Sequence, residues 1–278
     1  MHSQPRLLTY RAAAHLLSGE PLKSVQADLD AAMENGHDEQ TQVIVLTLRG
    51  LIALYQGRIA ASRQLLEQSV SSMANGQNIW RTLAMDELAL NHLRYGNRRQ
   101  AENLMIECLA AADRTGNVMN GVLALCRLGE LALLECRYED AEWLYSEALV
   151  RSTRDGNRLP IAGIACIGLG RLNLERGELN AAVERLEEGV CRIHRWGDTM
   201  AIEGYLQLAT AQSLQQKWSE AEAALQRARE ISHSFDATTI DDDLVELQQV
   251  ELWLAHGEDL AANMWLNRQA HAEHLTPE

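Results

Sequence analysis

The amino-acid sequence predicts an all-α protein, a superhelix of about seven antiparallel helical hairpins with a period of about 40 residues. Two observations predict this fold class. The first is the composition, because Ala, Leu, Glu, Gln and Arg dominate the 278 residues, and four prolines and one phenylalanine leave little that favours sheets. The second is a turn residue that recurs after 38, 39, 40, 41, 39 and 41 residues, at Gly19, Gly57, Gly96, Cys136, Gly177, Gln216 and Gly257.

Each repeat also carries a small residue at two fixed distances from its turn. Seven residues before the turn stand Ala12, Gly50, Ala89, Gly129, Gly170, Ala209 and, as the one larger exception, Val250. Five residues after the turn stand Ser24, Ser62, Ala101, Ala141, Ala182, Ala221 and Ala262. Two antiparallel helices joined by a short turn approach closely only where neither presents bulk. We therefore expect the helices of each hairpin to pack closely at these positions.

The helices on either side of each turn follow from the apolar spacing. Leu128 and Leu131 before the turn at Cys136, and Leu144 and Ala148 after it, show the i, i+3, i+4 spacing of a buried helical face. Residues that favour the left-handed end of a helix close six of the units, namely Gly36, Gly76, Gly116, Gly156, Gly197 and Asp236. The expected hairpins span residues 5–36, 41–76, 79–116, 119–156, 160–197, 200–236 and 240–275 of a single solenoid domain over residues 1–278.

These repeats resemble a known family. Twelve positions separate Gly129 from Ala141, and seven more lead to Ala148, which resembles the Gly-Ala-Ala frame of the tetratricopeptide repeat (TPR). The segments "LGELALLECRYEDA" and "LGRLNLERGELNAA" are similar to the repeat domain of MalT-like transcriptional activators of the LuxR class. The resemblance implies a right-handed superhelix that senses an effector. It also implies a fragment of a longer regulator, whose NTPase and helix-turn-helix parts would lie outside these residues.

The charge and the cysteines exclude several function classes. The chain has 39 acidic and 25 basic side chains and a formal net charge of −14, so a phosphate backbone would repel it and we expect no direct nucleic-acid binding. Five cysteines without CxxC spacing indicate free thiols in the cytoplasm. Among them, Cys136 replaces a turn glycine and is a candidate reactive thiol, with a plain turn residue as the alternative. No apolar run is long enough to span a membrane.

No sequence motif indicates catalysis. The chain lacks a phosphate-binding loop, a nucleophile elbow, an HExxH motif and a GxGxxG motif, so we expect no catalytic residue and no cofactor. His271 and His274, with Glu273 between them, have a spacing that a metal site can use. A solvated chain end explains the same residues, and we expect no metal.

The candidate binding residues lie on the first helix of each hairpin. In stacked repeats of this type, the first helices line the concave side of the superhelix. Seven residues are expected near that surface, namely Asp86, Arg127, Glu130, Arg171, Glu203, Gln207 and Thr210, with Trp80 and Tyr205 close to its edge. Arginines and carboxylates can hydrogen-bond a polar ligand, and an aromatic face can stack on it. Alternatively, these side chains pair with one another and hold the stack in register.

Two functions follow from this arrangement. The resemblance implies a regulatory domain that binds a small inducer or a modulating protein in the concave groove. The alternative is a protein-interaction scaffold, whose groove takes a peptide or a helix of a partner. A compact and partly apolar pocket would favour the sensor, and a long polar groove would favour the scaffold. The last hairpin carries Trp253, Leu254, Trp265 and Leu266, which indicates burial against a missing segment or self-association.

Overall fold

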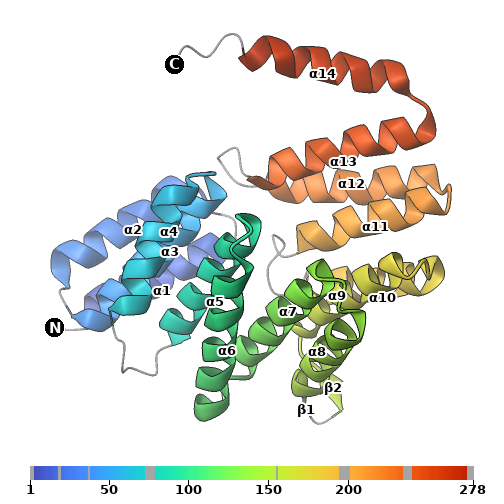
Figure 1. Cartoon of the computed structure of the whole chain (residues 1–278). Coiled ribbons are helices and arrows are strands. Elements are labelled where there is room, and N and C mark those ends of the chain that lie inside the picture. The colour runs from blue at the N-terminus through green and yellow to red at the C-terminus, as the bar shows by residue number, and fades with distance from the viewer. Residues whose placement is uncertain are drawn as a thin grey trace.

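A computed structural model describes residues 3–17, 20–36, 38–72, 79–154, 156–193, 201–233 and 240–273. The described residues form fourteen helices and one two-stranded hairpin, so the all-α prediction is confirmed (Figure 1). The first helices of the successive units are α1 (Ser3–Leu17), α3 (Glu39–Tyr55), α5 (Ile79–Arg94), α7 (Val118–Leu134), α9 (Ala162–Glu175), α11 (Ile202–Leu214) and α13 (Ile240–His256). The second helices are α2 (Leu22–Asn35), α4 (Ile59–Ser71), α6 (Arg98–Thr115), α8 (Tyr138–Arg151), α10 (Leu179–Ile193), α12 (Trp218–Ser232) and α14 (Asp259–Glu273).

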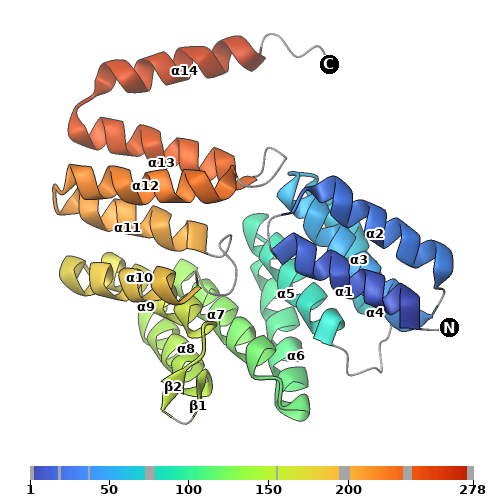
Figure 2. The ribbon, with the colours of Figure 1, turned by 180° about the vertical axis from the view of Figure 1, so that it is seen from behind.

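The units stack so that their first helices form the inner layer of a superhelix. Each first helix from α3 to α11 packs against both its own partner and the first helix of the next unit (Figure 2). The stack curves so that α13 comes back into contact with α3. Two segments that are far apart in the sequence thus border the same concave space.

The predicted turns are confirmed at six of the seven positions. Glycines 57, 96, 177 and 257 adopt φ between 68° and 82°, the left-handed region that glycine tolerates without cost. Cys136 and Gln216 adopt the same conformation, with φ of 57° and 60°, although each carries a β-carbon. Gly19 lies outside the described residues. The turn geometry is therefore constant while the residue at its centre varies.

The close helix approach is confirmed at the glycines of the first slot. A β-carbon at Gly50 would lie 2.7 Å from Leu66, and one at Gly170 would lie 2.6 Å from Leu186. Both partners stand on the second helix of the same hairpin. The prediction for Ser24 is wrong, because Ser24 is exposed and its neighbour Val25 is buried. The first hairpin therefore uses a register shifted by one residue.

The predicted helix ends are correct in one case and wrong in two. Gly116 ends α6 in the left-handed conformation, with φ of 65°. Gly36 follows α2 with φ of −143°, an extended conformation that needs no glycine. Gly156 has a left-handed φ of 76°, but α8 ends earlier, and this glycine stands in the turn of a small strand hairpin. Gly76, Gly197 and Asp236 lie outside the described residues.

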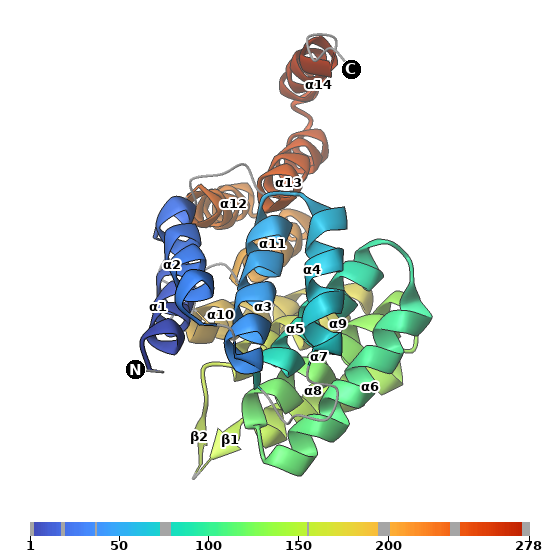
Figure 3. The same ribbon diagram turned by 90° about the vertical axis from the view of Figure 1, so that its left-hand side faces the viewer.

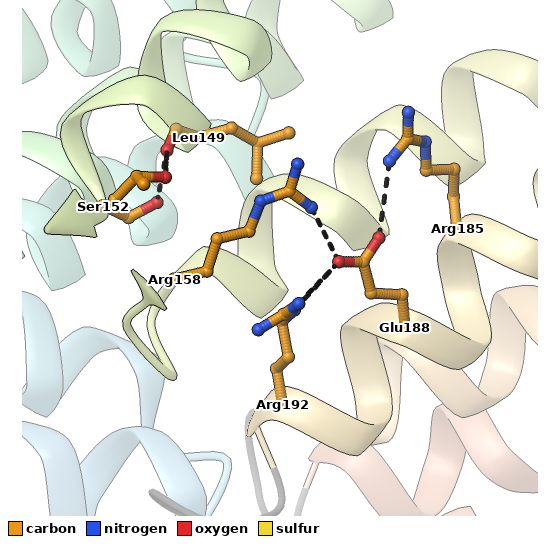
Figure 4. A network of polar contacts seen from close by, with 7 residues as sticks. Leu149, Ser152, Arg158, Arg185, Glu188 and Arg192 are labelled. Atoms are coloured by element: carbon orange, nitrogen blue, oxygen red, sulfur yellow. Dashed lines mark hydrogen bonds and ion pairs between the residues drawn. The ribbon is translucent and has the colours of Figure 1, made fainter. Parts of the chain in front are cut away.

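The strand hairpin is an addition that the sequence reading does not predict. Strand β1 (Thr153–Arg154) pairs antiparallel with β2 (Asn157–Arg158). Arg158 donates from Nη1 to Oε1 of Glu188 on α10 at 2.7 Å, and Arg192 donates to the same oxygen at 2.9 Å (Figure 4). Arg185 donates to the other carboxylate oxygen at 3.3 Å. One carboxylate thus joins the strand hairpin to the outer helix of the next unit.

The C-terminal helix packs against little of the rest of the stack. Helix α14 stands apart from the rest of the stack and has α13 as its main neighbour (Figure 3). Three apolar side chains on it are more than half exposed, namely Leu260, Met264 and Leu266. Within the described residues, no helix combines the length and the apolar character that crossing a bilayer requires.

Candidate functional site

A cavity of about 480 Å³ opens on the concave side of the superhelix. Six first helices, from α3 to α13, contribute to its walls. The apolar wall comprises Leu54, Leu90, Leu93, Leu134, Ile164, Ile167, Ile202, Leu206 and Leu244. The charged wall comprises Glu87, Arg127, Glu130, Arg171 and Glu203. The cavity is open to the surface on part of its boundary, and its lining is mainly apolar with a smaller set of charged side chains.

Five of the nine predicted site residues form one chain of ion pairs, which we term the charge ladder: Asp86, Arg127, Glu130, Arg171 and Glu203. Arg127 lies 3.5 Å from Asp86 and 3.4 Å from Glu130. Arg171 lies 3.7 Å from Glu130 and 3.6 Å from Glu203. The ladder crosses α5, α7, α9 and α11, so its charges alternate along the inner surface of the stack. This is the mutual pairing that the sequence leaves open beside ligand binding.

The buried end of the ladder is the pair of Asp86 and Arg127. The Asp86 side chain is 2% exposed, and neither of its oxygens accepts a hydrogen bond from a described residue. Burial raises the pKa of the Asp86 carboxyl, because a charged carboxylate loses its hydration there. Burial alone would lower the pKa of the Arg127 guanidinium, but the charges of Asp86 and Glu130 outweigh it and raise that pKa. Arg127 thus remains a cation.

The ladder is loosely paired compared with the ion pairs on the outer surface. Its four contacts measure 3.4 to 3.7 Å. Outer pairs such as Arg151 with Asp113, at 2.6 Å, have the short distance of a charge-assisted hydrogen bond. Arg171 donates no hydrogen bond to any residue in the described part of the chain, although its side chain is only 22% exposed. Its donors are therefore not hydrogen-bonded within the described residues, and a contact between Arg171 and a ligand stays a prediction.

Five of the nine predicted site residues do not line the cavity, namely Asp86 in the ladder and the four residues outside the ladder. Gln207 donates to Glu203 at 2.9 Å, and Thr210 donates to the backbone carbonyl of Leu206 at 3.2 Å. Tyr205 packs against the apolar core around α11, and Trp80 packs against the N-terminal core. A contact between any of these four side chains and a ligand stays a prediction.

The sequence reading misses Tyr145, which comes from the outer helix α8 and lines the cavity. Its ring lies beside Gly129 on α7 and Gly168 on α9, where β-carbons would collide with it. The side chain is 2% exposed, and its hydroxyl makes no hydrogen bond with the described residues. Burial and the charge of Glu130 raise the pKa of this hydroxyl, so it stays protonated and can donate.

A signal for Tyr145 is present in the repeats. The residue nine positions after the turn is aliphatic in five of the seven units, namely Leu66, Met105, Leu186, Leu225 and Leu266. It is Asp28 in the first unit and the bulky Tyr145 in the fourth. The residue nine positions before the turn is larger than glycine in every unit except the fifth, which has Gly168. An unusually large side chain in the fourth unit, Tyr145, and an unusually small residue in the fifth, Gly168, indicate that these two positions meet in space.

Among the remaining chemical candidates, the reactivity of the Cys136 thiol stays a prediction. Cys136 is exposed in its turn, as is Cys191 elsewhere on the surface, and Cys108 is buried. The side chains of His271 and His274 lie outside the described residues. In the part of the chain that the structure describes, no three His, Cys, Asp or Glu side chains come close enough together to hold a metal ion.

A protein family and several solved structures match this chain. A family model described as the MalT-like TPR region matches residues 44–277. No curated protein matches the chain by sequence. The solved structure of NprR in complex with its cognate peptide NprX has a TM-score of 0.71 and 13% identity, and the match covers 99% of this chain and 83% of that one.

Two further solved structures share the architecture. A Rap protein complexed with competence and sporulation factor has a TM-score of 0.68 and 12% identity, over 98% of this chain and 85% of that one. A signal-transduction ATPase with a tetratricopeptide-repeat sensor, from Pyrococcus horikoshii, has a TM-score of 0.58 and 14% identity, over 97% of this chain and 43% of that one. At these identities the likeness establishes a shared fold.

Proposed function

Since the chain belongs to the MalT-like TPR family, we propose that it is the effector-binding part of a regulator and that the effector binds in the concave cavity. The domain itself carries out no reaction in this proposal. The NTPase and DNA-binding parts of the regulator would lie outside residues 1–278, and the effector would be a small molecule or a regulatory protein.

The observation that carries this proposal is the shape of the cavity. Its volume of about 480 Å³ falls in the range of small-molecule sites, and apolar side chains surround a few convergent polar groups. A scaffold for long partners would present an open and continuously polar groove instead. The volume and the mainly apolar lining of the cavity therefore favour a discrete effector.

The position of the cavity explains how an effector could act. Leu54 and Tyr55 on α3 border it from one side, and Leu244 on α13 borders it from the other. A ligand that touches both helices stabilises the curvature in which they meet. A tenfold shift in the population of that arrangement requires about 1.4 kcal/mol of differential binding. Binding would thus be coupled to the C-terminal end of the domain.

A peptide is the second candidate for the occupant. The NprR structure is a complex with its cognate peptide NprX, the Rap structure is a complex with competence and sporulation factor, and both proteins share this fold. A short segment of a peptide or a partner protein would suit the cavity. This version differs from the first only in the kind of molecule that enters the concave space.

A thermal-shift screen of the purified domain tests the proposal, because a ligand that binds only the folded state raises Tm. The library should combine small metabolite-like compounds with short peptides. Leu90→Trp narrows the cavity from α5, and Leu260→Trp places the same bulk on the exposed surface of α14. We expect a saturable rise in Tm that is lost in L90W and kept in L260W. A ligand that binds L90W as well as it binds the wild type would place the site elsewhere.

A further inference from the structure

The polar groups of the cavity contain an unfilled position. Tyr145 is 2% exposed and lines the cavity, and its hydroxyl has no hydrogen-bond partner in the described part of the chain. The hydroxyl is not among the fully buried polar atoms that lack a partner, so it reaches accessible space. Because Tyr145 lines the cavity, we take that space to be the cavity. A ligand atom that accepts a hydrogen bond would complete it.

Arg171 lines the same cavity and offers donors there. Its guanidinium is bordered by Glu130 at 3.7 Å and Glu203 at 3.6 Å, and neither contact is a hydrogen bond. The charges of Glu203 and Glu130 raise its pKa although burial alone would lower it, so it remains charged. Tyr145 and Arg171 both line the cavity, so a hydroxyl and a guanidinium face the same space. A carboxylate is the ligand group that accepts hydrogen bonds from both kinds of donor.

The other charges restrict what that ligand can be. The charged wall has three carboxylates, on Glu87, Glu130 and Glu203, against the guanidiniums of Arg127 and Arg171. A simple anion would approach Arg171 against the repulsion of the glutamates on either side. A ligand with one positive and one negative group can form short ion pairs with both the arginine and the glutamates of the ladder. Its own net charge is zero, so the net charge of the cavity does not change.

We propose that the effector is a zwitterion with an apolar side chain, an amino acid or a short peptide, an inference that rests on the proposed function. Its carboxylate accepts hydrogen bonds from Tyr145 and Arg171, and its ammonium group donates to Glu130 or Glu203. Its side chain packs against the apolar wall formed by Ile164, Ile167 and Leu206. Tyr145 and Gly168 are the two departures from the repeat pattern that create this position.

Calorimetric titration of the whole chain with matched probes tests the inference. The probes are L-leucine, L-phenylalanine and the dipeptide Leu-Leu, each also in N-acetylated and in C-amidated form. We expect at least one unblocked probe to bind, with blocking at either end weakening its affinity by roughly tenfold or more, because each charged hydrogen bond is lost. Comparison of the amino acids with the dipeptide distinguishes the two sources of a zwitterion.

Three variants locate the contact. Tyr145→Phe removes only the hydroxyl, and Arg171→Lys keeps the charge but loses the planar pair of donors. Both should weaken binding of the unblocked probe several-fold and leave the affinity of its C-amidated form almost unchanged. Tyr95→Phe is the matched control, since Tyr95 is 56% exposed and does not line the cavity. The Tm of each variant reports whether it is folded.

The outcomes separate this inference from the proposed function. If no zwitterionic probe binds, but a neutral or singly charged compound does and L90W abolishes its binding, the proposed function stands and the zwitterion is wrong. Equal affinity of the unblocked probe for the wild type and for Y145F and R171K would also overturn the inference. Binding that L90W does not weaken would overturn both.

Discussion

The ring of Tyr145 occupies the space that a side chain at position 168 would need. A β-carbon at Gly168 would lie 2.6 Å from Cδ1 of that ring, and still closer to its other edge atoms. The two residues belong to different hairpins, so this contact joins the fourth unit to the fifth. It also brings a polar group from the outer layer of the superhelix to the concave cavity.

This relationship predicts that Gly168→Ala destabilises the protein by about 1–3 kcal/mol, because the buried ring has to move. Tyr145→Leu introduces the aliphatic residue that five other units have at this position and should recover most of the loss. A double-mutant cycle in urea unfolding measures the coupling, expected at about 1 kcal/mol or more. Gly121→Ala is the control, since a β-carbon there meets nothing closer than 3.6 Å and alanine favours the helix. Additive effects of G168A and Y145L would contradict the prediction.

The buried carboxyl of Asp86 predicts a pH dependence of stability. Burial raises its pKa above the ordinary value of 3.8. A carboxyl with a raised folded-state pKa stabilises the fold while protonated, and this contribution is lost as the pH rises through the folded-state pKa. The free energy of unfolding of the wild type should therefore fall relative to that of Asp86→Asn as the pH rises above 3.8.

Urea unfolding of both proteins at a series of pH values from about 3.5 to 7 checks this prediction. The series starts at about 3.5 because that lies near the ordinary pKa of aspartate. Asp243→Asn, at an exposed position on α13, serves as the control and should parallel the wild type. Parallel curves for D86N and the wild type would show that Asp86 has the same affinity for protons in both states.

The turn at Gln216 predicts a gain in stability. This residue is exposed and has φ of 60°, a conformation that costs a residue with a β-carbon about 1 kcal/mol more than glycine. Gln216→Gly should therefore raise the free energy of unfolding by about that amount. The adjacent Gln215 has φ of −82°, so Gln215→Gly should lower stability instead. The prediction fails if thermal unfolding ranks Q216G at or below the wild type.

The three arginines around Glu188 predict a second pH effect, of opposite sign. Burial alone would raise the pKa of this carboxyl, but Arg192 and Arg158 outweigh it, and the pKa lies below its ordinary value of 4.5. Its stabilising contribution is present above pH 4.5 and is lost as the pH falls through the folded-state pKa. Glu188→Gln should cost about 1 kcal/mol at pH 7 and little at low pH.

Denaturant unfolding of E188Q at pH 7 and near pH 3 tests this, with the exposed neighbour Glu187→Gln as the control. We expect E187Q to match the wild type at both pH values. A loss in E188Q that is equally large at both would show that charge on Glu188 is not what stabilises the strand hairpin against α10.

The spacing of the residues by itself determined the repeat, the turns and the close approach of the helices within a hairpin. These features are local, because a turn of fixed geometry and two helices about 15 residues long bring the same pairs of positions together in every unit, as with Gly50 and Leu66 or Gly170 and Leu186. The departures at Gly36, Ser24 and Gly156 arise where the backbone conformation or the helix end differs from the repeat.

Only the tertiary structure decided which side chains of different hairpins meet. The pairing of Arg171 with Glu130 and Glu203, the burial of Asp86 and the entry of Tyr145 into the cavity depend on the rotation of each unit relative to the next. The rotations of five successive units add up to bring α13 back into contact with α3, and this contact closes the concave space. A small rotation per unit has no signature in one repeat, and its accumulated effect determines the cavity.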